Sequence, residues 1–287
     1  MKIVNLLKIL ALTYCVSAPA QAQLVNINYP NFNNTAGLTL NGDATALNNG
    51  VDPNQVIRLA EISSFSSGSV FSSAQINAAE FNTRFQFRIE NGGGITDDSS
   101  EGGADGLAFI IQNVSNSLGA SGAGIGYQGV TDSVAVEFDT FDNSFDPDTN
   151  HVGIGVNGNI DTPPADTVFV SERFDNNKLW TVWVDYDGAN LEVRANTTGS
   201  RPTATLLTKN IDIGSTISSV DGKAFLGFSG ATGAAFGNHD LVSWQYRSEF
   251  QEGGFGDIPE PSTIGLIAMM GLGGFLYLRR RGQRKTA

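Results

Sequence analysis

The feature that most constrains the fold of this chain is a period-two alternation of apolar and polar residues. Phe85, Phe87 and Ile89 alternate with two polar residues, and a second strand-like stretch at 183–186 ends before Asp187-Gly188. Because successive side chains of a strand point to opposite faces of a sheet, this pattern favours strands over helices. Turn or loop segments rich in Gly, Ser, Asn and Asp recur at the spacing that the short strands of an all-β sandwich require. They lie at 92–104, 115–124, 142–150, 196–202 and 230–238.

The N-terminal residues have the pattern of a secretory signal peptide. Lys2 and Lys8 lie on the amino side of an apolar run, and Ala20-Gln21-Ala22 follows as an A-x-A cleavage site. We therefore expect residues 1–22 to be a leader. The only cysteine, Cys15, lies inside it, so the mature domain has no disulfide and must be held by its core or by metal. A domain of roughly 230 residues is large enough for a single sandwich core.

The C-terminal residues have three parts in a defined order. Pro259-Glu260-Pro261 precedes an apolar stretch at about 263–278, and a cluster of arginines and one lysine follows. We expect a membrane helix, slightly short of ~20 residues but extended by snorkelling arginines, with its basic tail in the cytoplasm. The preceding segment, 251–258, is expected to be a flexible linker that holds the domain away from the membrane.

The same order of parts over 259–287 resembles the PEP-CTERM sorting signal of Gram-negative bacteria. The resemblance implies export through the inner membrane and cleavage near Pro-Glu-Pro by a sorting protease, an exosortase. It also implies delivery to the cell surface, the outer membrane or an extracellular matrix. An ordinary tail anchor is the alternative.

The charge of the chain limits its partners. Of the 17 Lys and Arg, seven lie in the leader and the tail, so ten basic residues accompany nearly all of the 29 Asp and Glu in the exported part. A surface this acidic repels phosphate backbones, which argues against nucleic acid as a partner. It suits a soluble extracellular surface or cation binding.

The most informative stretch is 134–154, where carboxylates follow a strand pattern. If 134–141 is a strand, the side chains of Glu137, Asp139 and Phe141 point to one face. Two carboxylates then converge beside apolar neighbours, where leaving them unpaired would be costly. A merely solvated acidic loop is the alternative.

The turn after this strand adds further ligand types. Asp142-Asn143 and Pro147 form a turn that would fold Asp146 and His151 back toward the strand. Calcium prefers an all-oxygen shell, whereas imidazole with carboxylates suits manganese or another transition ion. Two adjacent ions, Ca²⁺ and Mn²⁺ or another transition ion, are therefore expected at such a mixed set.

The order Glu-x-Asp-x-x-x-Asn-x-x-Asp-x-x-x-x-His in this stretch resembles the metal-binding signature of legume (L-type) lectins. The resemblance implies that the manganese ligands are Glu137, Asp139, Asp146 and His151. It implies that the calcium ligands are Asp139, the carbonyl of Phe141, Asn143 and Asp146.

A second segment, 103–109, resembles the A-D-G-x-A-F segment of that family. The resemblance implies a cis peptide before Asp105, held by calcium through water, and a carboxylate that accepts hydrogen bonds from two sugar hydroxyls. The other implied sugar contacts come from side chains and backbone groups of three segments: Phe141, Asn143, Gly122, Ala123, Gly124, Ala234, Ala235 and Phe236.

Further segments at 227–233 and 239–244 extend the resemblance over nearly all of 24–250. It implies a concanavalin A-like antiparallel β-sandwich or jelly roll over 23–250, which binds a monosaccharide or glycan terminus with the help of metal and is not an enzyme. Plant members usually have Gly-Gly where this chain has Gly122-Ala123, and the loop 234–238 is short and apolar. The identity of the sugar and the oligomeric state therefore stay open.

Two other functions are compatible with parts of the sequence. A β-glucanase on the same sandwich needs an E-x-D-x-E strand, but Phe141 stands where the second glutamate, the proton donor, belongs. A matrix or adhesion protein whose lectin fold no longer binds sugar is the other alternative, since fold does not determine function. We expect His239 and the three tryptophans, Trp180, Trp183 and Trp244, to be structural.

Overall fold

The computed structural model describes residues 26–97, 103–117 and 122–256. The leader expected at 1–22 and the membrane helix expected at 263–278 lie outside these residues. Among the described residues, no helix has the length and apolar character needed to cross a membrane.

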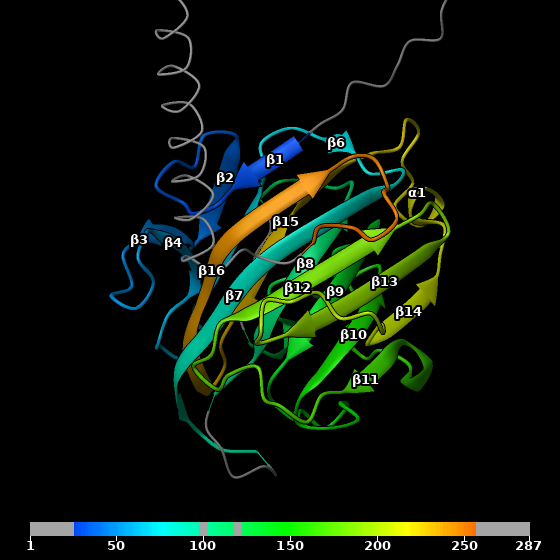
Figure 1. Ribbon diagram of the computed structural model, residues 1–287. Coiled ribbons are helices and arrows are strands. Elements are labelled where there is room, and N and C mark those ends of the chain that lie inside the picture. Colours follow the sequence, from blue (N-terminus) through cyan, green and yellow to red (C-terminus); the bar gives the residue numbers. More distant parts are fainter. Residues whose placement is uncertain (1–25, 98–102, 118–121, 257–287) are drawn as a thin grey trace, which may run out of the picture.

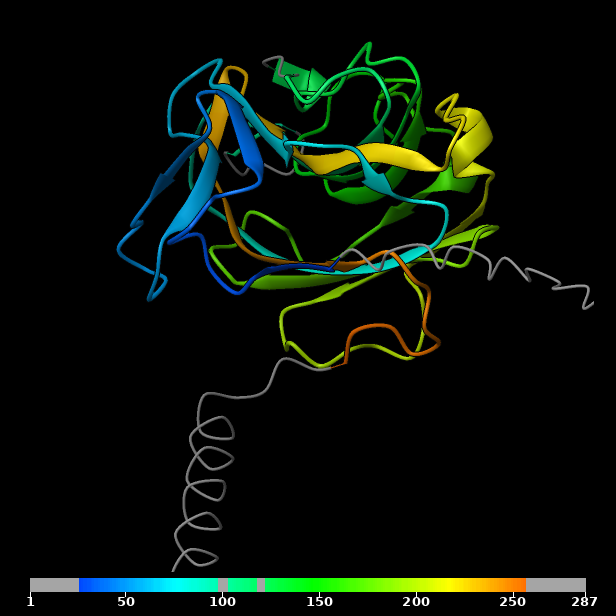
Figure 2. The same cartoon turned by 90° about the horizontal axis from the view of Figure 1, so that it is seen from above.

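Two antiparallel sheets of eight strands each form a sandwich (Figures 1 and 2). Sheet A follows the order β14 (Leu207–Asn210), β13 (Asn190–Asn196), β12 (Trp180–Tyr186), β7 (Phe81–Gly94), β16 (Ala235–Arg247), β4 (Val56–Ala60) and β3 (Thr45–Leu47), with β1 (Asn26–Tyr29) paired to β16. Sheet B follows the order β11 (Thr167–Phe169), β10 (His151–Val156), β9 (Ser133–Asp139), β8 (Gly106–Gln112), β15 (Lys223–Ala231), β5 (Ser67–Ser72) and β2 (Leu38–Gly42), with β6 (Ile76–Asn77) paired to β15. The expected all-β sandwich is confirmed.

Short helical turns occupy only three places in the described chain. They are the 3-10 turns η1 (Gly122–Gly124) and η2 (Pro164–Asp166) and the single-turn helix α1 (Ile213–Thr216). The Asp212 side chain caps α1 by accepting a hydrogen bond from the Ser215 backbone N–H.

The turn predicted at Asp187-Gly188 shows how local sequence ends a strand. The Asp187 carboxylate accepts hydrogen bonds from the backbone N–H groups of Ala189 and Asn190, at 2.8 and 2.6 Å. Gly188 has a φ of +92°, which side-chain-bearing residues rarely adopt. The chain therefore reverses between β12 and β13, which pair directly.

The core between the sheets is aromatic. Phe85 and Phe87 of β7 meet Phe109, Phe138 and Phe228 of sheet B, and all five rings are fully buried. The alternation noted in the sequence places these side chains on the inner faces, because residues two apart in a strand share a face.

The outer faces of both sheets are partly covered as well. Over sheet B, the loop after η1 packs Ile125 and Tyr127 against Ala108, Ile110 and Ala135 to form a second, smaller core. Over sheet A, the outward-pointing Thr181, Trp183 and Asp185 of β12 are buried. Figure 2 shows the segment that follows β16 on the outer side of sheet A.

Phe85 allows a test of the core, because its ring contacts four other buried rings. We expect Phe85→Ala to lower the free energy of unfolding by about 3–5 kcal/mol, since it removes buried apolar area and leaves a cavity. Urea titration followed by tryptophan fluorescence measures this. Val220→Ala is the control, because Val220 is fully exposed, and its effect should stay within about 0.5 kcal/mol. Equal effects of the two variants would contradict this view of the core.

Candidate cation and sugar site

The register of sheet B assembles the candidate site. Asp139, the last residue of β9, lies opposite His151, the first residue of β10, and opposite Gly106 at the start of β8. Glu137 and Asp139 point to the outer face, whereas Phe138 lies in the core. The predicted convergence of two carboxylates on one face of this strand matches the structure.

The strand is shorter than the expected 134–141. It ends at Asp139 because the Asp139 carboxylate accepts a hydrogen bond from the Phe141 backbone N–H at 2.8 Å, which turns the chain. Phe141 therefore lies in the loop and not on the strand face. Asn143 and Asp146 close that loop: the Asn143 N–H donates to the Asp146 carboxylate, and the Asp146 N–H donates to the Asn143 carbonyl, both at 2.8 Å.

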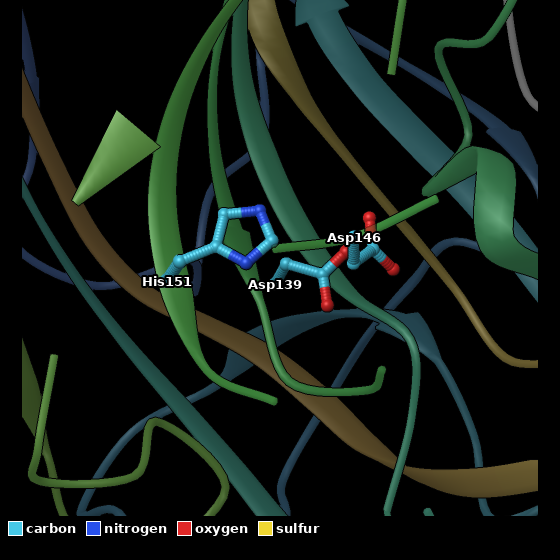
Figure 3. A group of neighbouring side chains, drawn as sticks. All are labelled: Asp139, Asp146 and His151. Carbon is cyan, nitrogen blue, oxygen red and sulfur yellow. The ribbon is translucent and has the colours of Figure 1, made fainter. Parts of the chain in front are cut away.

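Asp139, Asp146 and His151 come together as Figure 3 shows, with the three side chains directed toward one another. One ligand atom from each lies within 4.8 Å of the others. Asp139 and His151 are almost completely buried. The turn thus folds Asp146 and His151 back toward the strand, as the sequence predicts.

Glu137 lies next to this cluster and is held by two hydroxyl groups. The buried Tyr127 hydroxyl donates to one carboxylate oxygen, and the Thr162 hydroxyl donates to the other at 3.2 Å. His151 Nε2 lies 3.8 Å from Glu137 Oε1. Its other ring nitrogen lies 3.3 Å from the Asp148 carboxylate. Nε2 therefore faces Glu137, and Nδ1 faces Asp148.

The carboxyl groups of the cluster titrate far from their ordinary range. Burial, and then the charges of Asp146 and Glu137, raise the pKa of Asp139 well above normal. Burial raises the pKa of Asp146 to about 6, although hydrogen bonds from Asn143 oppose this. Burial opposes a charge on His151, but the hydrogen bond and charge of Glu137 outweigh it and raise the pKa of the imidazole. Crowded, poorly solvated carboxylates of this kind favour a bound cation.

Asp105 lies beside this cluster through sheet B. The Thr140 N–H donates to the Asp105 carbonyl at 3.1 Å, and the Asp105 N–H donates to the Ala231 carbonyl at 2.8 Å. The Ala104–Asp105 peptide is cis, as the resemblance implies. The Asp105 side chain is buried, and one carboxylate oxygen accepts no hydrogen bond from the described residues. Burial, and then the charge of Asp146, raise its pKa to about 7.

Gly233 faces the Asp105 carboxylate. A Cβ built on Gly233 would lie 3.2 Å from Asp105 Oδ2 and 3.7 Å from the Gly122 Cα. The Gly122 N–H donates to the Thr232 carbonyl at 2.9 Å, so η1 is attached to this loop. Glycine at 233 leaves the space in front of the carboxylate open.

The predicted sugar contacts from the loop 234–238 are placed differently from one another. Ala234 is exposed and follows Gly233, but Ala235 is buried and pairs with Gly94 as the first residue of β16. The Phe236 ring lies over Gly93 of β7. Asn143 is tied to Asp146 of the cation cluster, and Gly122 lies beside Gly233, with Ala123 and Gly124 following it in η1.

Several residues that support the site were not predicted from the sequence. Gly233 lies in the segment 227–233, which resembles a legume-lectin segment, so this resemblance could have indicated its role. Tyr127 and Thr162 gave no signal, because their contact with Glu137 joins separate segments. The same holds for Arg173, whose guanidinium pairs with Asp175 and donates to the Thr140 carbonyl at 2.7 Å.

Comparison with known proteins identifies the class. The family model of the legume lectin domain matches residues 24–259, and a model of the PEP-CTERM protein-sorting motif matches residues 257–281. The chain therefore belongs to the legume lectin family and carries a PEP-CTERM motif.

Relatives and solved structures agree with this assignment. A seed lectin of Vatairea macrocarpa is 27% identical over 80% of this chain and 97% of its own length. An L-type lectin-domain containing receptor kinase VIII.1 of Arabidopsis thaliana is 33% identical over 59% of this chain. The chain spans about a quarter of the length of such kinases.

Among solved structures, the winged bean acidic lectin complexed with methyl-α-D-galactose has a TM-score of 0.66 at 25% identity, covering 80% of this chain and 100% of that one. The basic winged bean lectin with Tn-antigen has a TM-score of 0.64 at 26% identity, covering 78% and 98%. These proteins are lectins, in agreement with the prediction that the chain is not an enzyme.

His239 of β16 offers a test of pH dependence away from the cation cluster. Burial lowers its pKa from 6.5 to about 4. The folded protein thus favours the neutral His239 ring. The contribution of this ring to stability is complete above pH 6.5. It is lost as the pH falls toward 4, because the unfolded chain binds a proton there before the folded chain does. The loss amounts to about 3 kcal/mol. We expect the Tm difference between wild type and His239→Leu to shrink or reverse over this range in thermal scans. A pH-independent difference would contradict the neutral, buried state.

Proposed function

We propose that the chain is a cation-dependent carbohydrate-binding protein that binds a monosaccharide or a glycan terminus at the outer face of sheet B. The observation that carries the proposal is the Asp105 carboxylate: a buried acceptor with an unused oxygen, opposite Gly233 and beside the cation cluster. A carboxylate in this position can accept hydrogen bonds from two neighbouring sugar hydroxyls.

The cations proposed are Ca²⁺ and Mn²⁺ or another transition ion. The donor set fits both: Asp139, Asp146, the Asn143 amide oxygen and the Phe141 carbonyl suit calcium, and His151 with carboxylates suits the transition ion. Glu137 is the further carboxylate proposed as a ligand of the transition ion. When bound, these ions would neutralise the crowded carboxylates.

The remaining sugar contacts follow from side-chain chemistry. The Asn143 amide can donate to a hydroxyl through its nitrogen, and the Phe141 ring is half-buried and can pack on an apolar sugar face. Ala123 and Gly124 offer backbone N–H groups, whereas the Gly122 N–H is already used by the Thr232 carbonyl, and Ala234 borders the open side of the site. Galactose and N-acetylgalactosamine glycans are the first to test, because similar lectins were solved with such ligands.

The sorting motif supports a proposal about location. We infer export and display at the cell surface, outer membrane or matrix of a Gram-negative bacterium, after anchoring by a C-terminal helix and processing by an exosortase. Weak single-site affinity would then be offset by multivalent display, which raises effective concentration.

Metal binding is tested by stability. Saturating Ca²⁺ and Mn²⁺ should raise the Tm at pH 7 by about 5–10 °C, because a ligand at about 100 times its Kd contributes about 2.7 kcal/mol. Asp139→Asn should lose most of this shift. Asp221→Asn, an exposed position before β15, should keep it. A wild-type Tm that does not change when either cation is added would refute the cation site.

Sugar binding is tested on a glycan array with and without EDTA. We expect binding that EDTA abolishes and that falls about 100-fold or more in Asp105→Asn, because a charged acceptor of two hydrogen bonds is lost. Gly233→Val should also abolish binding, since its side chain fills the space in front of Asp105. Both variants should keep their cation-dependent Tm shift. An array without signal, from protein that binds cations, would favour the structural or adhesion protein.

A further inference from the structure

The segment that follows β16, residues 249–256, lies against the outer face of sheet A. We call it the strap. The Gln251 N–H donates to the Asn82 side-chain oxygen at 2.8 Å, and the same oxygen accepts from the Arg247 guanidinium at 2.8 Å. Asn82 is fully buried and also donates to Asp185 of β12. The strap is therefore joined to a buried polar network and not only to surface side chains.

Two guanidinium groups hold the aromatic ring near the end of the strap. Arg247 of β16 lies 4.7 Å from the centre of the Phe255 ring, and Arg84 of β7 lies 5.7 Å from it. Arg84 also donates to the Gly256 carbonyl. A cation that faces an aromatic ring is attracted by its quadrupole, and two such contacts fix one ring from neighbouring strands.

Gly254 lies where there is no free space for a side chain between the strap and the sheet. A Cβ built on it would lie 2.7 Å from Asp185 Oδ1 and 3.0 Å from the Arg201 guanidinium, which itself pairs with Asp185 at 2.7 Å. A side chain there would displace either the strap or the Asp185–Arg201 ion pair beneath it. By contrast, a Cβ on Gly253 or Gly256 would meet no atom within 4 Å.

The strap and the cation cluster lie on opposite faces of the molecule. The strap covers sheet A on the side away from sheet B, as Figure 2 shows, whereas Glu137 and Asp139 point outward from sheet B. The PEP-CTERM motif begins at residue 257, directly after the strap.

We propose that the strap is an intramolecular docking element that makes the chain leave the domain from the outer face of sheet A, opposite the cation cluster. Any surface that holds the protein through its sorting motif then faces sheet A, and the outer face of sheet B is presented away from that surface. The eight residues would span about 28 Å if released. That length would let the domain turn over, so docking decides the orientation. Docking itself does not depend on the proposed sugar binding.

Hydrogen exchange of the full-length chain tests the docking. We expect amides of 249–256 to be protected, and Gly254→Ala to accelerate their exchange about tenfold or more while core amides stay unchanged. Gly256→Ala is the matched control and should leave exchange unchanged. Gly253→Ala controls for backbone conformation, since Gly253 and Gly254 both have positive φ. Unprotected wild-type amides, or equal effects of the three variants, would overturn the proposal.

Spin labels test where the chain leaves the domain. Cysteines at Gly256 and at the exposed Thr208 of β14, in a Cys15→Ser background, should give one narrow distance distribution. Phe255→Leu keeps the apolar volume but removes the ring, and it should broaden that distribution. A broad distribution already present with Phe255 intact would overturn the docked position of the strap. Sugar binding and cation binding should be unchanged in every strap variant, so failure here and failure of the lectin proposal are distinguishable.

Discussion

The close approach of carboxyl groups at the ends of β8, β9 and β10 is the constraint on which the candidate site depends. Sheet register places His151 and Gly106 on either side of Asp139. The aromatic core beneath holds that register, because shifting β9 by one residue would bring Phe138 to the outer face and the carboxylates inward. The core thus stabilises the geometry of the site, whereas repulsion among its carboxylates destabilises it. A bound cation would relieve that repulsion.

Much of this arrangement could be predicted from the sequence, because its determinants are local. Alternation in β7 and β9 indicates which side chains face inward, and Asp187-Gly188 marks a turn through its own side chain and backbone. Glu137 and Asp139 lie at the end of β9, and His151 begins the adjacent antiparallel strand β10 after one loop. Residues this near in sequence are brought together once the two strands pair.

The remainder depends on contacts between distant segments, which no spacing rule reveals. Tyr127 and Thr162 reach Glu137 from separate loops, and Arg173 supports Thr140 across 33 positions. The sequence also predicts a strand that reaches residue 141, whereas β9 ends at Asp139 because the Asp139 side chain turns the chain there. The composition of 251–258, rich in glycine, predicts a flexible linker, yet residues 251–256 lie against sheet A, and a Cβ on Gly254 would meet the Asp185 side chain.

The position of β16 in sheet A has a consequence for biogenesis. This strand, residues 235–247, lies between β7 and β4 and also pairs with β1, so one late segment joins three earlier ones. A nascent chain that lacks it has the unpaired edges of β7 and β4 and an open core. Sheet A can therefore close only after residue 247 has been synthesised, and pairing over such sequence distances is slow. Until β16 is made, the strands that precede it keep open edges, so the order of synthesis delays the completion of sheet A.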